Sequence, residues 1–226
     1  MPKTVETRVG VCYNDFKYCT KGETEMLISL VVPCYNEEES LPIFYKEASK
    51  IAQQMGISHG ADFEFIFVDD GSKDRTLQIA RELHRKDARV RYISFSRNFG
   101  KEAGIYAGLK AAKGDYVATM DADLQDDVDA MDRMIDAYEA GNDIVYGVRS
   151  SRQKDTFFKR NTAQLFYRLL HFLGAEVVYN HADYRLLSRR AAKGLLSFEE
   201  VNLFLRGIVP MVGYKSTTVT YERGER

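Results

Sequence analysis

Short apolar runs alternate with helical periodicity from Met26 to Arg149. The runs, which we predict to be strands, are LISLVVPCYN, FEFIFVDDGS, VRYISFS, DYVATM and DIVYGV. The segments between them, which we predict to be helices, are ESLPIFYKEASKIAQQM, TLQIARELHR, KEAGIYAGLKAAKG and a stretch near 128–140. This alternation is typical of βαβ units, so the sequence predicts an α/β fold with a mostly parallel sheet.

The alternation stops after Arg149. FFKRNTAQLFYRLLHFLG is predicted to be a helix rich in aromatic residues and leucine, YNHADYRLLS an extended segment, and EEVNLFLRGIVPMVGY a short apolar helix. Residues 1–25 are polar without sustained periodicity, so we expect an extension outside the core. The remaining residues, 26–226, are expected to form one domain.

Composition narrows the class of protein. The 226 residues are 45% hydrophobic and 29% charged, which is typical of a globular chain with a substantial core. The formal net charge of -1 gives no indication of a nucleic-acid partner. Three cysteines cannot form a disulfide framework, which favours a reducing setting. No apolar run approaches the roughly 18 residues of a spanning helix, so we expect this chain to be soluble.

Polar clusters follow three of the predicted strands. They are Pro33-Cys34-Tyr35-Asn36-Glu37 after the first, Asp69-Asp70-Gly71-Ser72 after the second and Asp121-Ala122-Asp123 after the fourth. Ligands of α/β sheets bind beyond the carboxyl ends of the strands. We therefore expect the three clusters to line one edge of the sheet and to form a binding site together.

The acidic cluster is the strongest candidate for a metal site. Asp121 and Asp123, two apart in an extended backbone, are expected to point to the same side, where a hard divalent cation would offset their repulsion. The alternative is that acidic residues cap the helix that follows. We favour a metal for Asp121 and Asp123, and the capping role for Asp126 and Asp127.

Two other clusters have two interpretations each. Asp69 and Asp70 either form a turn with Gly71 or accept hydrogen bonds from a nucleobase or ribose. Arg97 and Lys101 lie before a helix start, as in an anion site, but a solvated loop is an equal alternative. Because GxxxxGK[ST] and GxGxxG are both absent, any phosphate would be held by metal and arginine.

Four segments carry a family resemblance: VVPCYNEEESLP, FIFVDDGSKDRT, SRNFGKEAGIYAGLKAAKGDYVATMDADLQD and NHADYRLLSRRA. From about Met26 onward the chain resembles family 2 of the inverting glycosyltransferases, in the polyprenyl-phosphate branch. The bactoprenol (undecaprenyl-phosphate) glucosyltransferases are nearest, and the dolichyl-phosphate mannosyltransferases are more distant. The resemblance implies a GT-A fold, with a nucleotide-sugar half over about 26–149 and an acceptor half over about 150–226.

The resemblance also implies site residues. Mg2+ or Mn2+ would be held by Asp121 and Asp123. The nucleotide sugar would be bound by Pro33, Tyr35, Glu37, Asp69, Asp70, Asp121, Ala122, Asp123, Arg149 and Arg226, and the acceptor phosphate by Arg97, Lys101 and Arg206. Asp183 matches the position proposed for the catalytic base, with Arg185 beside it. A phosphate monoester is mostly dianionic near neutral pH, so it needs little proton abstraction. We therefore expect Asp183 to act as a base or an orienting residue rather than as a base alone. A structural pair with Arg185 is the alternative.

The expected function is therefore transfer of a hexose, glucose from UDP-glucose, to a polyprenyl phosphate with inversion. The alternatives are mannosyl transfer from GDP-mannose and a non-catalytic nucleotide-binding scaffold. The 157–173 helix is expected either to lie on a membrane surface or to pack in a core or oligomer interface. Relatives continue past YERGER with two spanning helices, so we expect a truncated catalytic domain that works at the cytoplasmic face of a membrane.

Overall fold

The computed structural model describes residues 5–6, 12–13, 26–123, 125–127, 129–149, 181–198 and 204–222. The strands are β1 (Val5–Glu6), β2 (Cys12–Tyr13), β3 (Met26–Cys34), β4 (Ala61–Asp69), β5 (Val90–Ser94), β6 (Tyr116–Thr119), β7 (Ile144–Arg149), β8 (His181–Ser188) and β9 (Ser216–Tyr221). The helices are α1 (Ser40–Ser58), α2 (Thr76–Lys86), α3 (Lys101–Ala111), α4 (Ala130–Glu139), α6 (Arg189–Leu196) and α7 (Leu205–Met211).

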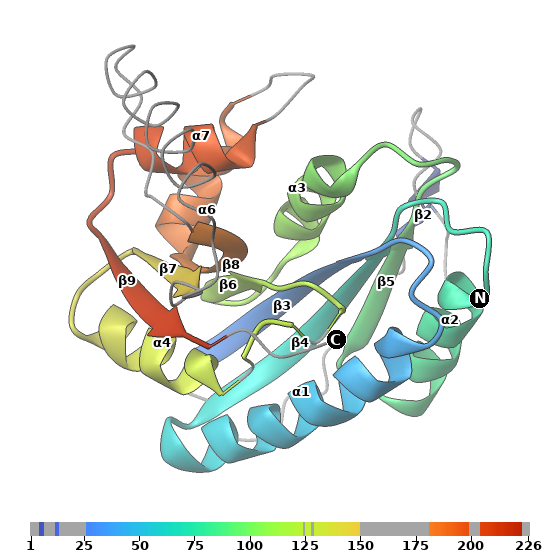
Figure 1. The fold of residues 1–226 in the computed structure, drawn as a ribbon, viewed down its shortest axis with the longest axis horizontal. Coiled ribbons are helices and arrows are strands. Elements are labelled where there is room, and N and C mark those ends of the chain that lie inside the picture. Colours follow the sequence, from blue (N-terminus) through green and yellow to red (C-terminus); the bar gives the residue numbers. More distant parts are fainter. Residues whose placement is uncertain are drawn as a thin grey trace, which may run out of the picture.

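These strands form one sheet in the order β1-β2-β5-β4-β3-β6-β8-β7-β9. The centre of the sheet, β5-β4-β3-β6, is parallel, and β7 pairs in parallel with β9. β8 is antiparallel to both of its neighbours, β6 and β7. The predicted α/β class with a mostly parallel sheet is confirmed. Figure 1 shows α1, α2 and α4 on one face of the sheet and α3, α6 and α7 on the other.

Alternating side chains of the strands supply a separate core to each face. On β3, Ile28, Leu30 and Val32 belong to the core under α1 and α4, whereas Val31 belongs to the core under α3 and α6. The predicted apolar stripe of α1 is buried against the first core, and its members are Leu41, Phe44, Ala48, Ile51 and Met55. Burial on both faces explains why the central strands are continuously apolar in the sequence.

Three features differ from the expected organisation or lie beyond it. The N-terminal extension is not wholly outside the fold, because β1 pairs with β2 and β2 pairs with β5 at the sheet edge. The sequence analysis also did not anticipate α6 and β9. The predicted 157–173 helix and Arg226 lie outside the described residues. Within those residues, no helix is long and apolar enough to cross a membrane.

Candidate functional site

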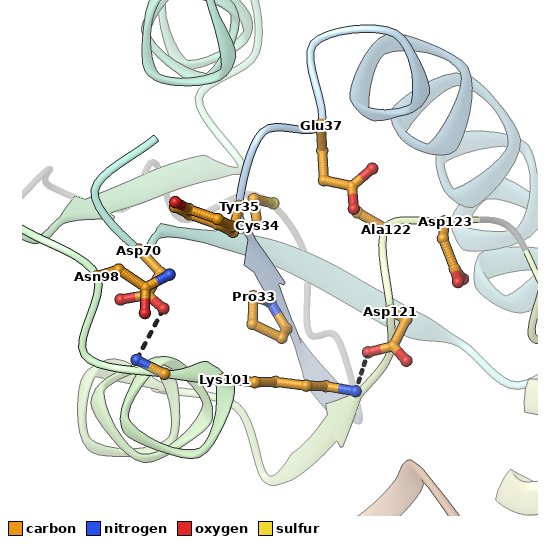
Figure 2. A pocket seen from close by; sticks show the side chains of 11 residues that line it. Pro33, Cys34, Tyr35, Glu37, Asp70, Asn98, Lys101, Asp121, Ala122 and Asp123 are labelled. Carbon is orange, nitrogen blue, oxygen red and sulfur yellow. Dashed lines mark hydrogen bonds and ion pairs between the residues drawn. The ribbon is translucent and has the colours of Figure 1, made fainter. Parts of the chain in front are cut away.

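The strand order reverses at β3, because β4 extends the sheet on one side of it and β6 on the other. Ligands of open α/β sheets bind at such a reversal, beyond the carboxyl ends of the strands. A cavity of about 300 Å³ opens there. Its lining residues are Pro33, Cys34, Tyr35, Glu37, Asp70, Asn98, Gly100, Lys101, Asp121, Ala122 and Asp123, as drawn in Figure 2. The three polar clusters of the sequence therefore meet at one edge.

The loops after β3 and β4 are held together by hydrogen bonds. Asn36, in the left-handed region with φ of 55°, donates its N–H to Ser72 Oγ at 3.0 Å and accepts from Lys73 N at 2.9 Å. The N–H of Glu37 donates to Thr76 Oγ1 at 2.8 Å. These contacts fix the loop that presents Tyr35 and Glu37 to the cavity.

Asp70 links the β4 loop to the start of α3. Its two carboxylate oxygens accept from the N–H groups of Phe99 at 2.7 Å and Gly100 at 2.9 Å. Next to it, Gly71 has φ of 68°, and a Cβ there would lie 2.4 Å from the carbonyl carbon of Arg97. Asp70 therefore lines the cavity and also anchors the segment that leads into α3, which Figure 2 shows beside it.

Asp69 has a structural role in this arrangement. Its carboxylate accepts from Ser72 N and from Ser94 Oγ, both at 3.1 Å, and the residue is buried. Asp69 does not line the cavity, unlike Asp70. The turn interpretation thus describes Asp69, whereas Asp70 combines the turn with the cavity wall.

Asp121 and Asp123 both line the cavity, although not through strand alternation. β6 ends at Thr119, and Asp123 lies in a turn. Figure 2 shows the ion pair between Lys101 and Asp121. The Nζ atom of Lys101 lies 2.6 Å from Oδ1 of Asp121. Burial raises the pKa of the Asp121 carboxyl, although the charge of Lys101 opposes the shift. Two carboxylates beside the cavity are ligands that suit Mg2+ or Mn2+, so the donor set fits a divalent cation.

Asp183 reaches the same edge because β8 runs antiparallel beside β6, so that the beginning of β8 lies near the end of β6. Three cations contact its carboxylate. Arg206 Nε lies 3.0 Å and Arg185 Nη2 3.1 Å from Oδ1, and Lys101 Nζ lies 2.6 Å from Oδ2. Burial alone would raise the pKa of Asp183, but hydrogen bonding from Arg206 and the charge of Lys101 hold it well below its usual range.

Arg185 is the most deeply buried of these cations, with 1% of its surface exposed. Its Nε and Nη1 atoms make no hydrogen bond within the described part of the chain. Glu102, on the first turn of α3, has one carboxylate oxygen in the same condition. Buried polar atoms without partners are uncommon in folded proteins, and a ligand, ion or water that completes the site is one explanation for them.

Arg97 and Arg149 are predicted site residues that do not line the cavity. The Arg97 guanidinium lies 4.2 Å from the Phe99 ring centre and does not line the cavity. Arg149 lies 3.2 Å from Asp126, whose carboxylate also accepts from the hydroxyl of Tyr221. Asp126 is therefore not a helix cap, and α4 begins only at Ala130, after Asp129. Asp127 does not cap α4 either, since its carboxylate accepts from Asp129 N.

The sequence analysis did not assign roles to Cys34, Asn98 and Gly100, which line the cavity. Each of the three lies in a segment that the sequence analysis did select. Their closeness in sequence to Tyr35 or Lys101 was therefore the only signal that could have indicated a place at the cavity. A separate group, His59, Asp136 and Glu139, has ligand atoms within 4.8 Å of one another. His59 follows the last residue of α1, so this group is a helix length away from the cavity.

The family model for glycosyl transferase family 2 matches residues 29–196. The chain is 42% identical over 208 residues to the uncharacterized glycosyltransferase YkoT of Bacillus subtilis (strain 168), covering 90% of this chain and 62% of that protein. It is 41% identical over 202 residues to the bactoprenol glucosyl transferase of Shigella phage SfV, covering 89% and 64%. The chain thus spans somewhat less than two thirds of these curated relatives.

Solved structures support the same fold. The mannosyltransferase PcManGT from Pyrobaculum calidifontis, in complex with GDP-Man and Mn2+, superposes with a TM-score of 0.58 at 18% identity, covering 86% of this chain and 55% of that one. Glucosyl-3-phosphoglycerate synthase from Mycobacterium tuberculosis, with Mn2+, UDP-glucose and phosphoglyceric acid, gives 0.55 at 20% identity, covering 94% and 78%. The fold is GT-A, and the chain belongs to glycosyl transferase family 2.

Proposed function

We propose that this glycosyltransferase moves glucose from UDP-glucose to a polyprenyl phosphate with inversion, using Mg2+ or Mn2+ at Asp121 and Asp123. The observation that carries the proposal is the contact of Lys101 with both Asp121 and Asp183. Lys101 thereby connects Asp121, at the edge of the cavity, to the group of three cations around Asp183. A nucleotide sugar and a second phosphate-bearing substrate would thereby lie side by side. The 41% identity to bactoprenol glucosyl transferases supports the choice of sugar and acceptor.

The cavity would take the nucleotide end of the donor. Tyr35, with 42% of its surface exposed at the cavity rim, offers a ring for a nucleobase. Glu37 and Asp70 add carboxylates that suit ribose hydroxyls or a base N–H. A divalent cation held by Asp121 and Asp123 would stabilise the negative charge of the leaving nucleoside diphosphate.

The group formed by Lys101, Arg185 and Arg206 would take the acceptor phosphate. Arg206 is accessible, with 45% of its side chain exposed, whereas Arg185 is buried and has two donor atoms that find no partner among the described residues. The three cations form ion pairs with two carboxylates, Asp121 and Asp183, which leaves one positive charge that a phosphate would help to neutralise. A lipid-linked acceptor together with a nucleotide-sugar donor would place the reaction at the cytoplasmic face of a membrane.

Asp183 is assigned an orienting role within this group. A carboxyl whose pKa lies well below its usual range is a weak base. The acceptor phosphate, in turn, has a second pKa of about 6 and needs little proton removal near neutral pH. We therefore propose that Asp183 positions Lys101 and Arg206 for the phosphate rather than accepting a proton from it.

The test is a transfer assay in detergent micelles with undecaprenyl phosphate. Radiolabelled UDP-glucose and GDP-mannose would each be supplied with Mn2+, Mg2+ or EDTA. We expect a labelled lipid product from UDP-glucose only, lost with EDTA. Asp183→Asn should lower kcat without shifting the pH profile, because no proton transfer is removed. Product from GDP-mannose would favour the mannosyl alternative, and binding of a donor nucleotide without any labelled lipid product would favour the nucleotide-binding scaffold.

A further inference from the structure

Lys101 occupies an unusual position for a cation beside a metal site. Its Nζ lies 2.6 Å from Asp121 and 2.6 Å from Asp183, so one ammonium group serves two carboxylates on different strand ends. Asp121 is also one of the two acids assigned to the divalent cation. Among the described residues, Lys101 is the only cation with an ion pair to Asp121. Two cations thus depend on the same carboxylate.

The backbone of Lys101 is fixed, whereas its side chain is partly exposed. Lys101 is the first residue of α3 and follows Gly100, whose N–H is held by Asp70. Its side chain is 40% exposed, so Nζ can move toward solvent or along the cavity. Asp183 also retains Arg185 and Arg206 whether or not Lys101 stays. Movement of the Lys101 ammonium group away from Asp121 therefore breaks a single ion pair.

We propose that Lys101 is a built-in counter-cation of Asp121, which the divalent metal must displace before it can bind. The inference rests on the proposed metal site and adds a residue that tunes it. In the metal-free protein the ammonium offsets the repulsion between Asp121 and its acidic neighbours. When the metal enters, Nζ leaves Asp121 and keeps its contact with Asp183.

This competition links the donor and acceptor sides of the site. A metal alone must replace the ammonium, so its affinity is reduced. A nucleoside diphosphate brings its own negative charge, which gives Lys101 a new partner and adds ligands to the metal. Metal and nucleotide should consequently bind with positive cooperativity, and that cooperativity should depend on Lys101.

The test measures free Mn2+ by electron paramagnetic resonance during titration, with and without UDP. Without UDP, Lys101→Met should bind Mn2+ about fivefold more tightly than the wild type, the size expected for one partly exposed ion pair. The gain in Mn2+ affinity that UDP produces should shrink by a similar factor. The readout is binding, so it does not require turnover.

Arg206→Gln is the matched control, because it removes a positive charge from Asp183 without vacating Asp121. A general electrostatic effect would raise Mn2+ affinity similarly in both variants. Equal Mn2+ affinities of Lys101→Met and Arg206→Gln would therefore overturn the inference. An affinity for Lys101→Met equal to that of the wild type would overturn it as well. Lys101→Gln repeats the measurement if the Met variant fails to fold by circular dichroism.

Asp121→Asn and Asp123→Asn separate this inference from the metal site itself. Both should lose Mn2+ binding if the site is assigned correctly. If the wild type binds Mn2+ with UDP and both Asn variants fail to, an unchanged Lys101→Met overturns the role of Lys101 alone. If neither Asn variant weakens Mn2+ binding, the metal site fails and the inference fails with it.

Discussion

Asp70 shows how one carboxylate can serve both the fold and the site. Its oxygens accept from Phe99 N and Gly100 N, and it is buried. Asp70→Asn keeps the shape but directs an amide N–H at one of these N–H groups. We expect the free energy of unfolding to fall by about 2 kcal/mol. Urea denaturation would measure it, with exposed Asp62→Asn as the neutral control. Equal losses in both variants would contradict the anchoring role.

Asp183 makes stability depend on pH in a defined direction. Its pKa is lowered in the folded state, so the unfolded chain binds a proton first as pH falls. The stabilisation is complete above the unfolded value of about 3.9 and is lost as pH falls through the folded value. Asp183→Asn should lower stability at pH 7 by about 3 kcal/mol, because it leaves buried Arg185 without its carboxylate.

Urea midpoints between pH 7 and pH 3 would test this effect. The wild type should lose stability with falling pH more steeply than Asp183→Asn, since the variant lacks the titrating group. Asp143→Asn is the comparison variant for the pH dependence of stability. The pKa of Asp143 is also lowered, by a hydrogen bond from Arg190, but Asp143 does not line the cavity. Parallel profiles for the wild type and Asp183→Asn would show that the three cations do not stabilise its charged form.

At the residue scale, the positions of the strand ends predicted which residues meet at the site, but not the role of each residue. Asp121, Asp123 and Asp70 were found because parallel strands end at one edge of the sheet. The distinction between Asp69 and Asp70 was not available, since it depends on which loop each side chain reaches. Asp126 was misjudged for a similar reason, because its partner, Arg149, is brought to it by tertiary packing.

At the element scale, α3 positions Lys101 through close contact with β3. A Cβ on Gly108 would lie 2.2 Å from Val31 Cγ1, whereas one on Gly104 would meet its nearest atom, Pro33 Cβ, at 3.4 Å. Gly108→Ala should destabilise the protein, because overpacking costs about 1–3 kcal/mol and exceeds the helix-propensity gain of about 1 kcal/mol.

Gly104→Ala is the matched control on the same helix. We expect it to be neutral or to stabilise by up to about 1 kcal/mol, since helix propensity improves without a severe clash. Thermal unfolding followed by circular dichroism would compare the two variants. Equal stability of the Gly108→Ala and wild-type proteins would mean that α3 does not lie as close to β3 as described here.

The order of elements up to β7 could be predicted because periodicity alone separates buried strands from amphipathic helices. The placement of β8 could not. It pairs with β6 and β7 in antiparallel fashion, although β7 follows β6 in the sequence. Nothing local in HADYRLLS indicates which strands it separates. That insertion brings Asp183 to the cavity edge, so the acceptor side of the site depends on long-range pairing.

At the scale of the whole molecule, the donor side is largely contained in residues 26–149. Within the described part of the chain, the cavity is lined only by residues of that range, whereas Asp183, Arg185 and Arg206 follow it. Donor binding should therefore be measurable separately from acceptor binding. The central claim, that the cavity binds a nucleoside diphosphate through a metal at Asp121 and Asp123, can be tested without an acceptor lipid.

The most direct measurement is calorimetric titration with UDP and with GDP, each with and without Mn2+. We predict that UDP binds only when Mn2+ is present, that GDP binds much more weakly, and that Asp123→Ala abolishes the Mn2+-dependent binding. Asp129→Ala, outside the cavity lining, should leave the titration unchanged. Mn2+-dependent UDP binding that survives in Asp123→Ala would contradict the metal assignment on which the proposed function rests.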